Sequence, residues 1–401
     1  MTAKPRFLYV SYDGMLEPLG QSQVLAYLER LAGEYEIRLI SFEKASDWQD
    51  GTRRAALEKR MAAAGIVWIP LRYHKVPSAL ATAYDIAVGT LVAIWQSLRH
   101  RPVAIHARSY VAGVMALMAK RVTGVRFLFD MRGFWADERV DGLLWPRDGR
   151  LHRFAKGVER RLLAGADHIV TLTEASVRAM ASFPGMNPAT PVTVITTCAD
   201  LRRFQPPTDR ATRPFVLGYV GSAGAWHLFD ESLLCFQLLL KREPDARLII
   251  LNRKDQPLIR DRLAALGIDG SRVELLAADH SEVPALMGRM SAGLSLIRPA
   301  FSKIASAPTK IAEYLGCGVP CLGNVGTGDV REILEGEGVG VVVTALDEAT
   351  LAAAVDRLVL LAREDGIAAR CRSTAERLFS LEGGVAAYAG IYRALSTEAG
   401  K

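Results

Sequence analysis

The sequence predicts an α/β protein with two doubly wound parallel sheets, and three observations lead to this prediction. Short apolar runs alternate with longer amphipathic segments along nearly the whole chain. The runs are rich in β-branched or aromatic residues and are bounded by turn or charged residues, which is typical of buried parallel strands. A polar stretch with three prolines, 204–214, interrupts the alternation once. Alternating strands and helices favour doubly wound sheets, so the interruption indicates two successive α/β units.

The expected strands follow from the apolar runs taken in order. In the first unit they lie at 7–12, 37–42, 67–70, 104–107, 127–130, 168–172 and 192–195. In the second they lie at 215–220, 248–251, 273–276, 293–296, 319–322 and 338–343. Helical spacing joins Val24, Leu25, Leu28 and Leu31 on one face, and a last amphipathic segment spans 381–395. We therefore expect domains at 1–205 and 206–378, followed by a closing helix within 379–401.

Composition restricts the partners. The 401 residues carry 50 Lys and Arg against 43 Asp and Glu, a formal net charge of +7. This excess suits anionic partners such as nucleotide phosphates, a diphosphate-lipid acceptor or an acidic membrane surface. Nucleic acid is disfavoured, because the aromatic residues are sparse and are not interleaved with Lys and Arg as stacking platforms require.

Cysteine use and hydropathy indicate a cytoplasmic protein. The five cysteines are scattered, which favours a reducing compartment, and no second pair completes a metal site around Cys317 and Cys321. We expect no signal peptide, and the most apolar stretch, 86–95, of the helix around 83–95 is about half the length needed to span a bilayer. Basic residues flank that helix at 72–75 and 99–101, so it fits either a core helix or a helix at the inner membrane surface.

The clearest candidate site lies in the second unit, within 297–318. This segment starts where a strand is expected to end and leads into a helix, so backbone N–H groups, hydroxyls and cations gather at one place, which suits a diphosphate. The candidate donor-binding residues there are Arg298, Ser302, Lys303, Ser306, Thr309, Lys310 and Glu313. Glu313 is suited to accept hydrogen bonds from ribose hydroxyls. A solvated and well-capped helix start explains the same residues.

Two further loops of the second unit end strands. The segment 218–224 is glycine-rich, and Gly221 and Ser222 would let backbone approach a ligand closely. Its spacing is not the dinucleotide fingerprint, and a tight strand-to-helix turn explains it equally well. Arg253 and Lys254 follow another strand and place two cations where phosphate could bind, although a plain solvated loop has the same composition.

The first unit has three candidate loops. Gly20 and Gln21 belong to a long loop after the first strand, where packing against the second domain is the alternative. Asp130 and Arg132 follow another strand end and suit contacts with substrate hydroxyls or charge, with an internal Asp137–Arg139 ion pair as the plainer interpretation of that loop. His106 and Arg108 complete the set, although a lone histidine is usually a core residue. In open α/β sheets ligands bind at such loops, so two facing sheets would share a cleft suited to group transfer.

Hydrolase motifs are absent. The sequence has no G-x-S-x-G elbow and no Walker A loop, and the adjacent Asp137 and Glu138 do not define a glycosidase pair.

Six segments together carry a family resemblance. They read DGMLEPLGQSQ at 13–23, HARSY at 106–110, DMRGFWADERV at 130–140, VITTCADLRRF at 194–204, GYVGS at 218–222 and SAPTKIAEYLGCGVP at 306–320. In this order and spacing the chain resembles the family-four retaining glycosyltransferases of the GT-B fold, those of bacterial polysaccharide and cell-envelope synthesis. The resemblance implies two Rossmann-like domains facing a central cleft, with a nucleotide-sugar donor in the second domain and the acceptor in the first.

The resemblance also implies a mechanism. It implies retention of anomeric configuration without metal or other cofactor, and a final helix that returns to the first domain. Under it, Asp130, Arg132 and Lys310 carry catalysis, the second-unit residues named above bind the donor, and Gly20, Gln21, His106 and Arg108 bind the acceptor. The chain departs from the family at Ala305, where a first glutamate is usual, and after Gly221, where Arg and Lys are usual.

Three alternatives remain. Ala305 motivates a degenerate scaffold that binds a nucleotide sugar without turnover. A GT-B-like phosphorylase would use phosphate as its substrate. A nucleotide-sugar epimerase would need a nicotinamide fingerprint that the sequence lacks.

Overall fold

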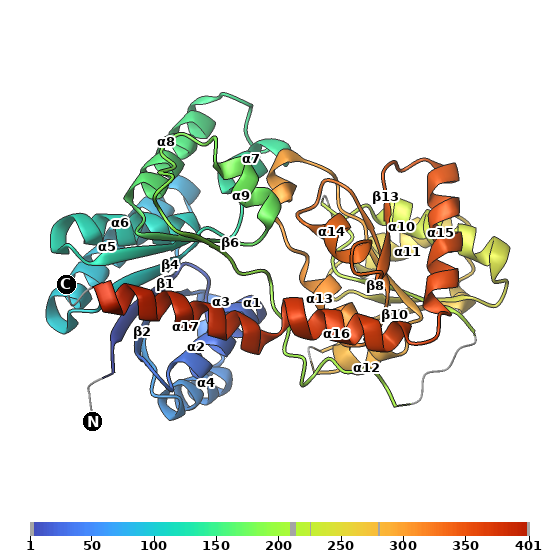
Figure 1. Ribbon diagram of the computed structural model, residues 1–401, viewed down its shortest axis with the longest axis horizontal. Helices are drawn as coiled ribbons and strands as arrows, with labels where there is room; N and C mark the ends of the chain where they lie inside the picture. Colours follow the sequence, from blue (N-terminus) through green and yellow to red (C-terminus); the bar gives the residue numbers. More distant parts are fainter. Residues whose placement is uncertain (1–3, 209–213, 225, 280, 399–401) are drawn as a thin grey trace. The chain divides into compact units, whose positions relative to one another are not determined.

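The structure is a computed structural model that describes residues 4–208, 214–224, 226–279 and 281–398 (Figure 1). Its chain forms two compact units. Unit 1 comprises Met1–Ile195 and Leu381–Lys401, and unit 2 comprises Thr196–Ser380. Part of the predicted linker, 209–213, lies outside the described residues.

In the described part of unit 1, seven parallel strands form one sheet in the order β3-β2-β1-β4-β5-β6-β7. The strands are β1 Arg6–Ser11, β2 Glu36–Glu43, β3 Val67–Arg72, β4 Ala104–Arg108, β5 Arg126–Asp130, β6 His168–Thr171 and β7 Val192–Val194. The helices are α1 Pro18–Gly20, α2 Ala26–Leu31, α3 Ala45–Trp48, α4 Gly51–Ala63, α5 Ser78–His100, α6 Ser109–Thr123, α7 Trp135–Asp141, α8 Arg150–Gly165, α9 Glu174–Met180 and α17 Leu381–Glu398, with a π-helix at Gln21–Leu25.

Unit 2 has a six-stranded parallel sheet within its described residues, in the order β10-β9-β8-β11-β12-β13. The strands are β8 Val216–Val220, β9 Arg247–Leu251, β10 Val273–Leu276, β11 Ala292–Ser295, β12 Cys321–Asn324 and β13 Gly340–Val343. The helices are α10 Phe229–Arg242, α11 Gln256–Ala265, α12 Val283–Gly288, α13 Thr309–Gly316, α14 Val330–Leu334, α15 Glu348–Ala362 and α16 Ile367–Phe379, with 3₁₀ turns at Gly270–Arg272 and Phe301–Ala305.

The sheets are apolar along their length because helices cover both faces. In β9, Leu248 and Ile250 join the core on one side of the sheet, while Ile249 and Leu251 join the core on the other. Neither face needs polar residues, which explains the continuous apolar runs. The prediction of two doubly wound parallel sheets is confirmed.

One strand lies two residues further along the chain than predicted. The expected strand at 319–322 forms at Cys321–Asn324 instead. Val319 still belongs to the turn that ends α13, since its N–H donates to Tyr314 O at 2.9 Å, and Pro320 has no N–H to pair in a sheet. The shift places Asn324 at the strand end, where it braces a neighbouring loop described below.

Candidate functional site

Each sheet has one point at which its strand connections leave in opposite directions. In unit 2 this point lies between the neighbours β8 and β11, and in unit 1 between β1 and β4. Ligands of open α/β sheets bind beyond the carboxyl ends of the strands at such points. The predicted site residues follow these strands or their neighbours in both units, so each unit is described in turn.

In unit 2, two loops meet at this point. Gly221 follows β8 with φ of +127°, and a Cβ added to it would lie 3.1 Å from Lys310 Nζ. The loop continues to His227, which forms an isolated β-bridge with Ile297 after β11. Next to this bridge, the Arg298 N–H donates to Trp226 O at 3.0 Å. Glycine at 221 therefore leaves room for a lysine ammonium between two loops that are joined by their backbones.

Lys310 is an unpaired buried cation. Its Nζ is shielded from solvent and has no hydrogen-bond partner among the described residues, and it lies 5.3 Å from the ring centroid of Tyr219. Burial lowers the pKa of Lys310 to about 8, although the carboxylate of Glu313 opposes this. Burying an unpaired ammonium is unfavourable, and an anionic ligand would relieve that cost.

Two more groups surround this cation. Lys303 places its ammonium 3.8 Å from the ring centroid of Trp226. His227 Nδ1 lies 3.0 Å from Ser222 Oγ. Burial, followed by the charges of Lys310 and Lys303, lowers the pKa of His227 to about 4, so its imidazole is neutral at pH 7. Two ammonium groups and a neutral imidazole at a strand end have the chemistry that suits a phosphate-bearing ligand.

Glu313 lies one turn beyond Lys310 on α13. Burial raises the pKa of Glu313 to about 7, against the lowering effect of Lys310 and Arg203. A carboxyl group in this range can accept or donate a hydrogen bond to a hydroxyl group near neutral pH.

The loop that carries these residues is braced from β12. Asn324 accepts a hydrogen bond from Ile297 N at 2.8 Å and donates one to Ile297 O at 2.8 Å. The Gly328 N–H donates to Lys303 O at 2.9 Å. Hydrogen bonds thus hold the backbone of the loop that carries Lys303, which favours pre-organised binding.

The remaining donor candidates lie on two different segments of unit 2. Ser302 is buried in the 3₁₀ turn that carries Lys303, and Ser306 and Thr309 lead into α13. Arg253 is already paired, since its guanidinium lies 2.7 Å from Asp279. Lys254 takes part in a turn in which its N–H donates to Asn252 Oδ1 at 2.9 Å.

In unit 1, the predicted catalytic pair lies within a buried network. Asp130 ends β5 and is 2% exposed. Its Oδ1 lies 3.9 Å from an Arg132 guanidinium nitrogen, and its Oδ2 lies 3.7 Å from His106 Nε2. Arg132 has φ of +59°, a left-handed conformation that is unusual for a residue with a side chain. On the neighbouring strand, Arg108 Nε lies 3.4 Å from Asp13 Oδ2.

Charge pairing sets the ionisation of this network. Burial would raise the pKa of Asp130, but Arg132 and His106 hold it below its ordinary value. Burial would lower the pKa of Arg132, but Asp130 raises it. Burial outweighs Asp130 at His106 and lowers its pKa, so the imidazole is neutral at pH 7. Asp130 Oδ1 and His106 Nε2 have no hydrogen-bond partner among the described residues.

Sequence reasoning missed two residues of this network. The helix α17 brings Tyr388, whose hydroxyl donates to Asp130 Oδ2 at 3.0 Å, and Tyr392, whose hydroxyl lies 2.9 Å from His106 Nδ1. Because His106 Nε2 faces the carboxylate, the proton is favoured on Nε2, and Tyr392 then donates to Nδ1. The spacing of Tyr388 and Tyr392 indicated only an apolar face, and their polar partners lie more than 250 residues away in the sequence.

Gly20 and Gln21 have a structural explanation. A Cβ on Gly20 would come within 2.1 Å of Gly14 O, so close backbone packing alone requires glycine there. Gln21 begins the π-helix and is half-buried. The plainer interpretation of Asp137 is corrected, since it pairs with Lys156 at 2.9 Å rather than with Arg139.

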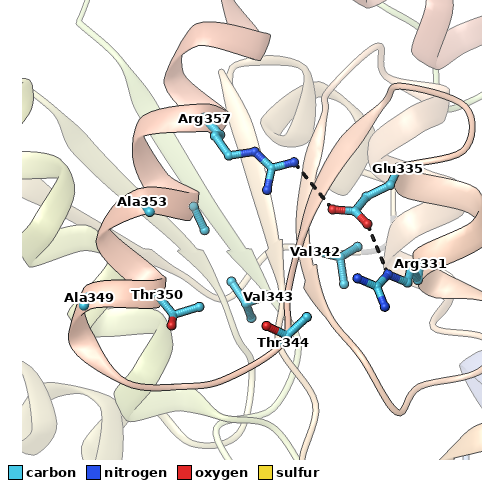
Figure 2. Close-up of a pocket in the computed structure, with 10 residues that line it drawn as sticks. Arg331, Glu335, Val342, Val343, Thr344, Ala349, Thr350, Ala353 and Arg357 are labelled. Carbon is cyan, nitrogen blue, oxygen red and sulfur yellow. Dashed lines mark hydrogen bonds and ion pairs between the residues drawn. The ribbon is translucent and has the colours of Figure 1, made fainter.

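Unit 2 also has an open groove of about 490 Å³ beside β13 and α15. Figure 2 shows Glu335 there between Arg331 and Arg357, at 3.2 and 3.5 Å. The two arginines are solvent-exposed and paired with the half-buried Glu335, and none of the three is a predicted site residue. The groove is therefore no better a candidate than the buried cluster around Lys310.

Comparisons with known proteins give the family. Residues 21–198 match a glycosyl transferase 4-like domain, and residues 214–360 match the glycosyl transferases group 1 domain. Comparison with curated protein sequences finds no match.

Solved structures resemble nearly the whole chain. Sucrose-phosphate synthase from Thermosynechococcus elongatus is 13% identical with a TM-score of 0.74, covering 98% of this chain and 100% of its own. A glycosyltransferase from Rickettsia africae is 15% identical with a TM-score of 0.73, covering 98% of each chain. HepE from Anabaena, solved with UDP and glucose, is 17% identical with a TM-score of 0.66, covering 96% of this chain and 98% of its own. The two domain matches and the shared two-domain fold assign this chain to the glycosyltransferases of the GT-B fold.

Proposed function

We propose that this chain transfers a hexosyl unit from a nucleotide-diphosphate sugar to a glycan or lipid-linked acceptor in cell-envelope or exopolysaccharide synthesis, with retention of configuration. The observation that carries the proposal is the buried, unpaired ammonium of Lys310 beside Gly221, at the switch point of unit 2. A ligand with adjacent phosphates is the natural counterpart of Lys310 and Lys303. The HepE structure that contains UDP and glucose supports a nucleotide sugar as that ligand.

The donor roles follow from position. Lys310 and Lys303 neutralise the diphosphate, and the hydroxyls of Ser306 and Thr309 add hydrogen bonds at the start of α13. Glu313 holds the ribose, one turn further along the helix. His227 fills the place near Gly221 where the family usually has a longer cation, and it donates from a neutral ring. Neutralising the leaving diphosphate lowers the barrier because negative charge grows there during transfer.

The roles in unit 1 concern the other substrate. Asp130 Oδ1 and His106 Nε2 offer an acceptor and a donor for a sugar hydroxyl, and Arg132 lies beside them. Arg108, Gly20 and Gln21 complete the proposed acceptor side. In this proposal, retention proceeds by positioning and electrostatics rather than through a covalent enzyme intermediate.

We further propose that no metal or cofactor takes part. Mg²⁺ neutralises diphosphates in many transferases, and Lys310 and Lys303 supply that neutralisation here. We also propose that the enzyme works at the cytoplasmic face of a membrane, where a lipid-linked acceptor would be located.

The test is a donor screen. Purified protein is incubated with UDP-, GDP- and ADP-hexoses and a lipid extract of envelope precursors, and mass spectrometry follows new glycosylated products. We expect one nucleotide class to give product in the presence of EDTA, and Lys310→Met to slow its formation about 100-fold.

A donor-binding scaffold is the second candidate, because Ala305 replaces the usual first glutamate. Tight nucleotide-sugar binding without product in any arm of the screen favours this scaffold. Formation of a sugar phosphate from a glycan and inorganic phosphate would favour a phosphorylase instead. Product whose anomeric configuration is inverted, read by NMR, would contradict the proposed retention.

A further inference from the structure

Helix α5 is apolar on the side that faces solvent. The side chains of this outer stripe recur every three, four or seven residues, and each is between 57% and 72% exposed. They are Leu80, Tyr84, Leu91, Trp95 and Leu98. A helix on the surface of a soluble domain normally turns its polar side outward. The reversed polarity of α5 indicates that its outer side faces something other than water.

The inner side of α5 is polar and firmly held. Asp85 accepts hydrogen bonds from Tyr12 Oη at 2.9 Å and from His74 N at 3.0 Å. Gln96 Oε1 accepts one from Arg38 Nε at 2.7 Å. By length and composition, Ala79–His100 is the one segment of the described chain apolar enough to cross a membrane. These buried contacts would all break if it did, so α5 is suited to lie on a bilayer rather than to span it.

Two neighbouring helices extend this surface. Right-handed connections from β3 to β4, β4 to β5 and β5 to β6 put α5, α6 and α8 on one face of the unit 1 sheet, where α6 packs against both of the others (Figure 1). Further large apolar side chains are exposed on α6, on α8 and on the loop before α8, by 40% to 86%. They are Met118, Val122, Leu143, Leu144, Leu151 and Phe154.

The exposed charge of the same layer is mostly positive. Its helices carry six exposed arginines that form no ion pair with a described residue: Arg99, Arg121, Arg150, Arg153, Arg160 and Arg161. The carboxylates of these three helices are Asp85 and Glu159, which are 1% and 2% exposed. The three helices therefore present cations and apolar groups to solvent, and the loop before α8 adds one exposed acid, Asp148. This excess of positive charge beside apolar groups matches an anionic lipid surface.

We propose that the outer face of α5, α6 and α8 docks on an anionic lipid bilayer. The arginines meet lipid phosphates, and the stripe of α5 enters the boundary between headgroups and acyl chains. A second copy of this chain fits less well, because pairing this face with itself would oppose arginines to arginines. The docking is independent of the proposed transfer reaction, since vesicle binding needs no donor or acceptor.

The test is sedimentation of the full chain with vesicles of phosphatidylcholine alone or with one third phosphatidylglycerol. We expect binding to the anionic vesicles that weakens in high salt. The double variants Leu91→Gln/Trp95→Gln and Arg150→Glu/Arg153→Glu should each weaken it about tenfold or more. All four positions are exposed, so folding should persist, and thermal unfolding checks this.

A matched control and a positional readout complete the design. Lys59→Glu on α4 and Leu360→Gln on α15 change an exposed basic and an exposed apolar residue outside this layer and should bind like the wild type. Brominated lipids should quench Trp95 emission, measured as the difference from Trp95→Phe. The proposal is overturned if the wild type ignores anionic vesicles, if it binds neutral vesicles equally, or if the control variants lose as much binding as the layer variants.

Discussion

The two units place a buried cation beyond their strand ends but surround it differently. In unit 1, Arg132 lies beside Asp130, which also receives the hydroxyl of Tyr388. In unit 2, Lys310 Nζ has no hydrogen-bond partner among the described residues, and burial lowers its pKa to about 8. The arginine is thus part of a paired network, whereas the lysine has no such partner among the described residues.

This difference predicts that the two cations contribute to the free energy of unfolding in opposite ways. A buried pair is costly to break because removing one partner leaves the other charge uncompensated. A buried charge without a partner lowers stability until a ligand supplies the counter-charge, which is typical of functional sites. Substituting each cation should therefore change stability in opposite directions.

The largest expected effect is in unit 1. Arg132→Met leaves the Asp130 carboxylate buried without its cation, and we expect a loss of about 3 kcal/mol in the free energy of unfolding. Urea denaturation measures it. Arg253→Met is the control, since its exposed pair with Asp279 should be worth less than about 1 kcal/mol. Equal losses in the two variants would show that Arg132 stabilises the fold no more than an exposed pair does.

Lys310→Met should have the reverse signature. Replacing an unpaired buried ammonium with an apolar side chain of similar length should raise the free energy of unfolding by roughly 1–3 kcal/mol. The same change should lower kcat about 100-fold, because the developing charge on the diphosphate loses its partner. A destabilised Lys310→Met protein would show that the lysine has a structural partner.

The pKa of Lys310 sharpens this prediction. The folded pKa of about 8 lies below the ordinary value of 10.5, so folding displaces a proton between these values. Burying the charged lysine therefore costs stability below pH 8, and this cost disappears above pH 10.5, where the lysine is neutral in both states. The advantage of Lys310→Met over the wild type should therefore be largest at pH 7 and shrink toward pH 10. Denaturation at both pH values measures it, and a constant difference would contradict the assigned pKa.

The smallest effect concerns α17. Tyr388→Phe removes a hydrogen bond to a buried carboxylate and should cost about 1–2 kcal/mol of stability and also raise KM for the acceptor. Tyr35→Phe is matched, since it removes a hydrogen bond of 3.1 Å to Ala389 O on the same helix without touching Asp130. We expect Tyr35→Phe to cost about 1 kcal/mol and leave KM unchanged. Similar KM values in both variants would restrict α17 to a structural role.

Much of the fold was predictable because strands buried on both faces leave a continuous apolar signal. Each expected run overlaps an observed strand, and the shift at Cys321 follows from a proline that periodicity does not register. The approach of the two segments that carry Gly221 and Lys310 was predictable because strand ends converge in parallel sheets.

Other features were beyond local pattern. His227 and Trp226 join the cluster through a bridge to Ile297, about 70 residues along the chain. Tyr388 and Tyr392 give an apolar helical signal that is silent about their polar partners. The reversed polarity of α5 was hidden for a similar reason, since periodicity shows that a face is apolar but not whether it turns toward the sheet.

The most direct test of the central claim, that unit 2 holds the donor nucleotide on an unpaired lysine, is a thermal-shift comparison of three proteins. Wild type, Lys310→Met and Tyr388→Phe are screened against UDP, GDP, ADP and CMP, with and without Mg²⁺. A ligand that binds only the folded state must raise the melting temperature. We predict that one nucleoside diphosphate stabilises wild type and Tyr388→Phe without Mg²⁺ but not Lys310→Met. An equal shift in Lys310→Met, or no shift in a well-folded wild type, would contradict the claim.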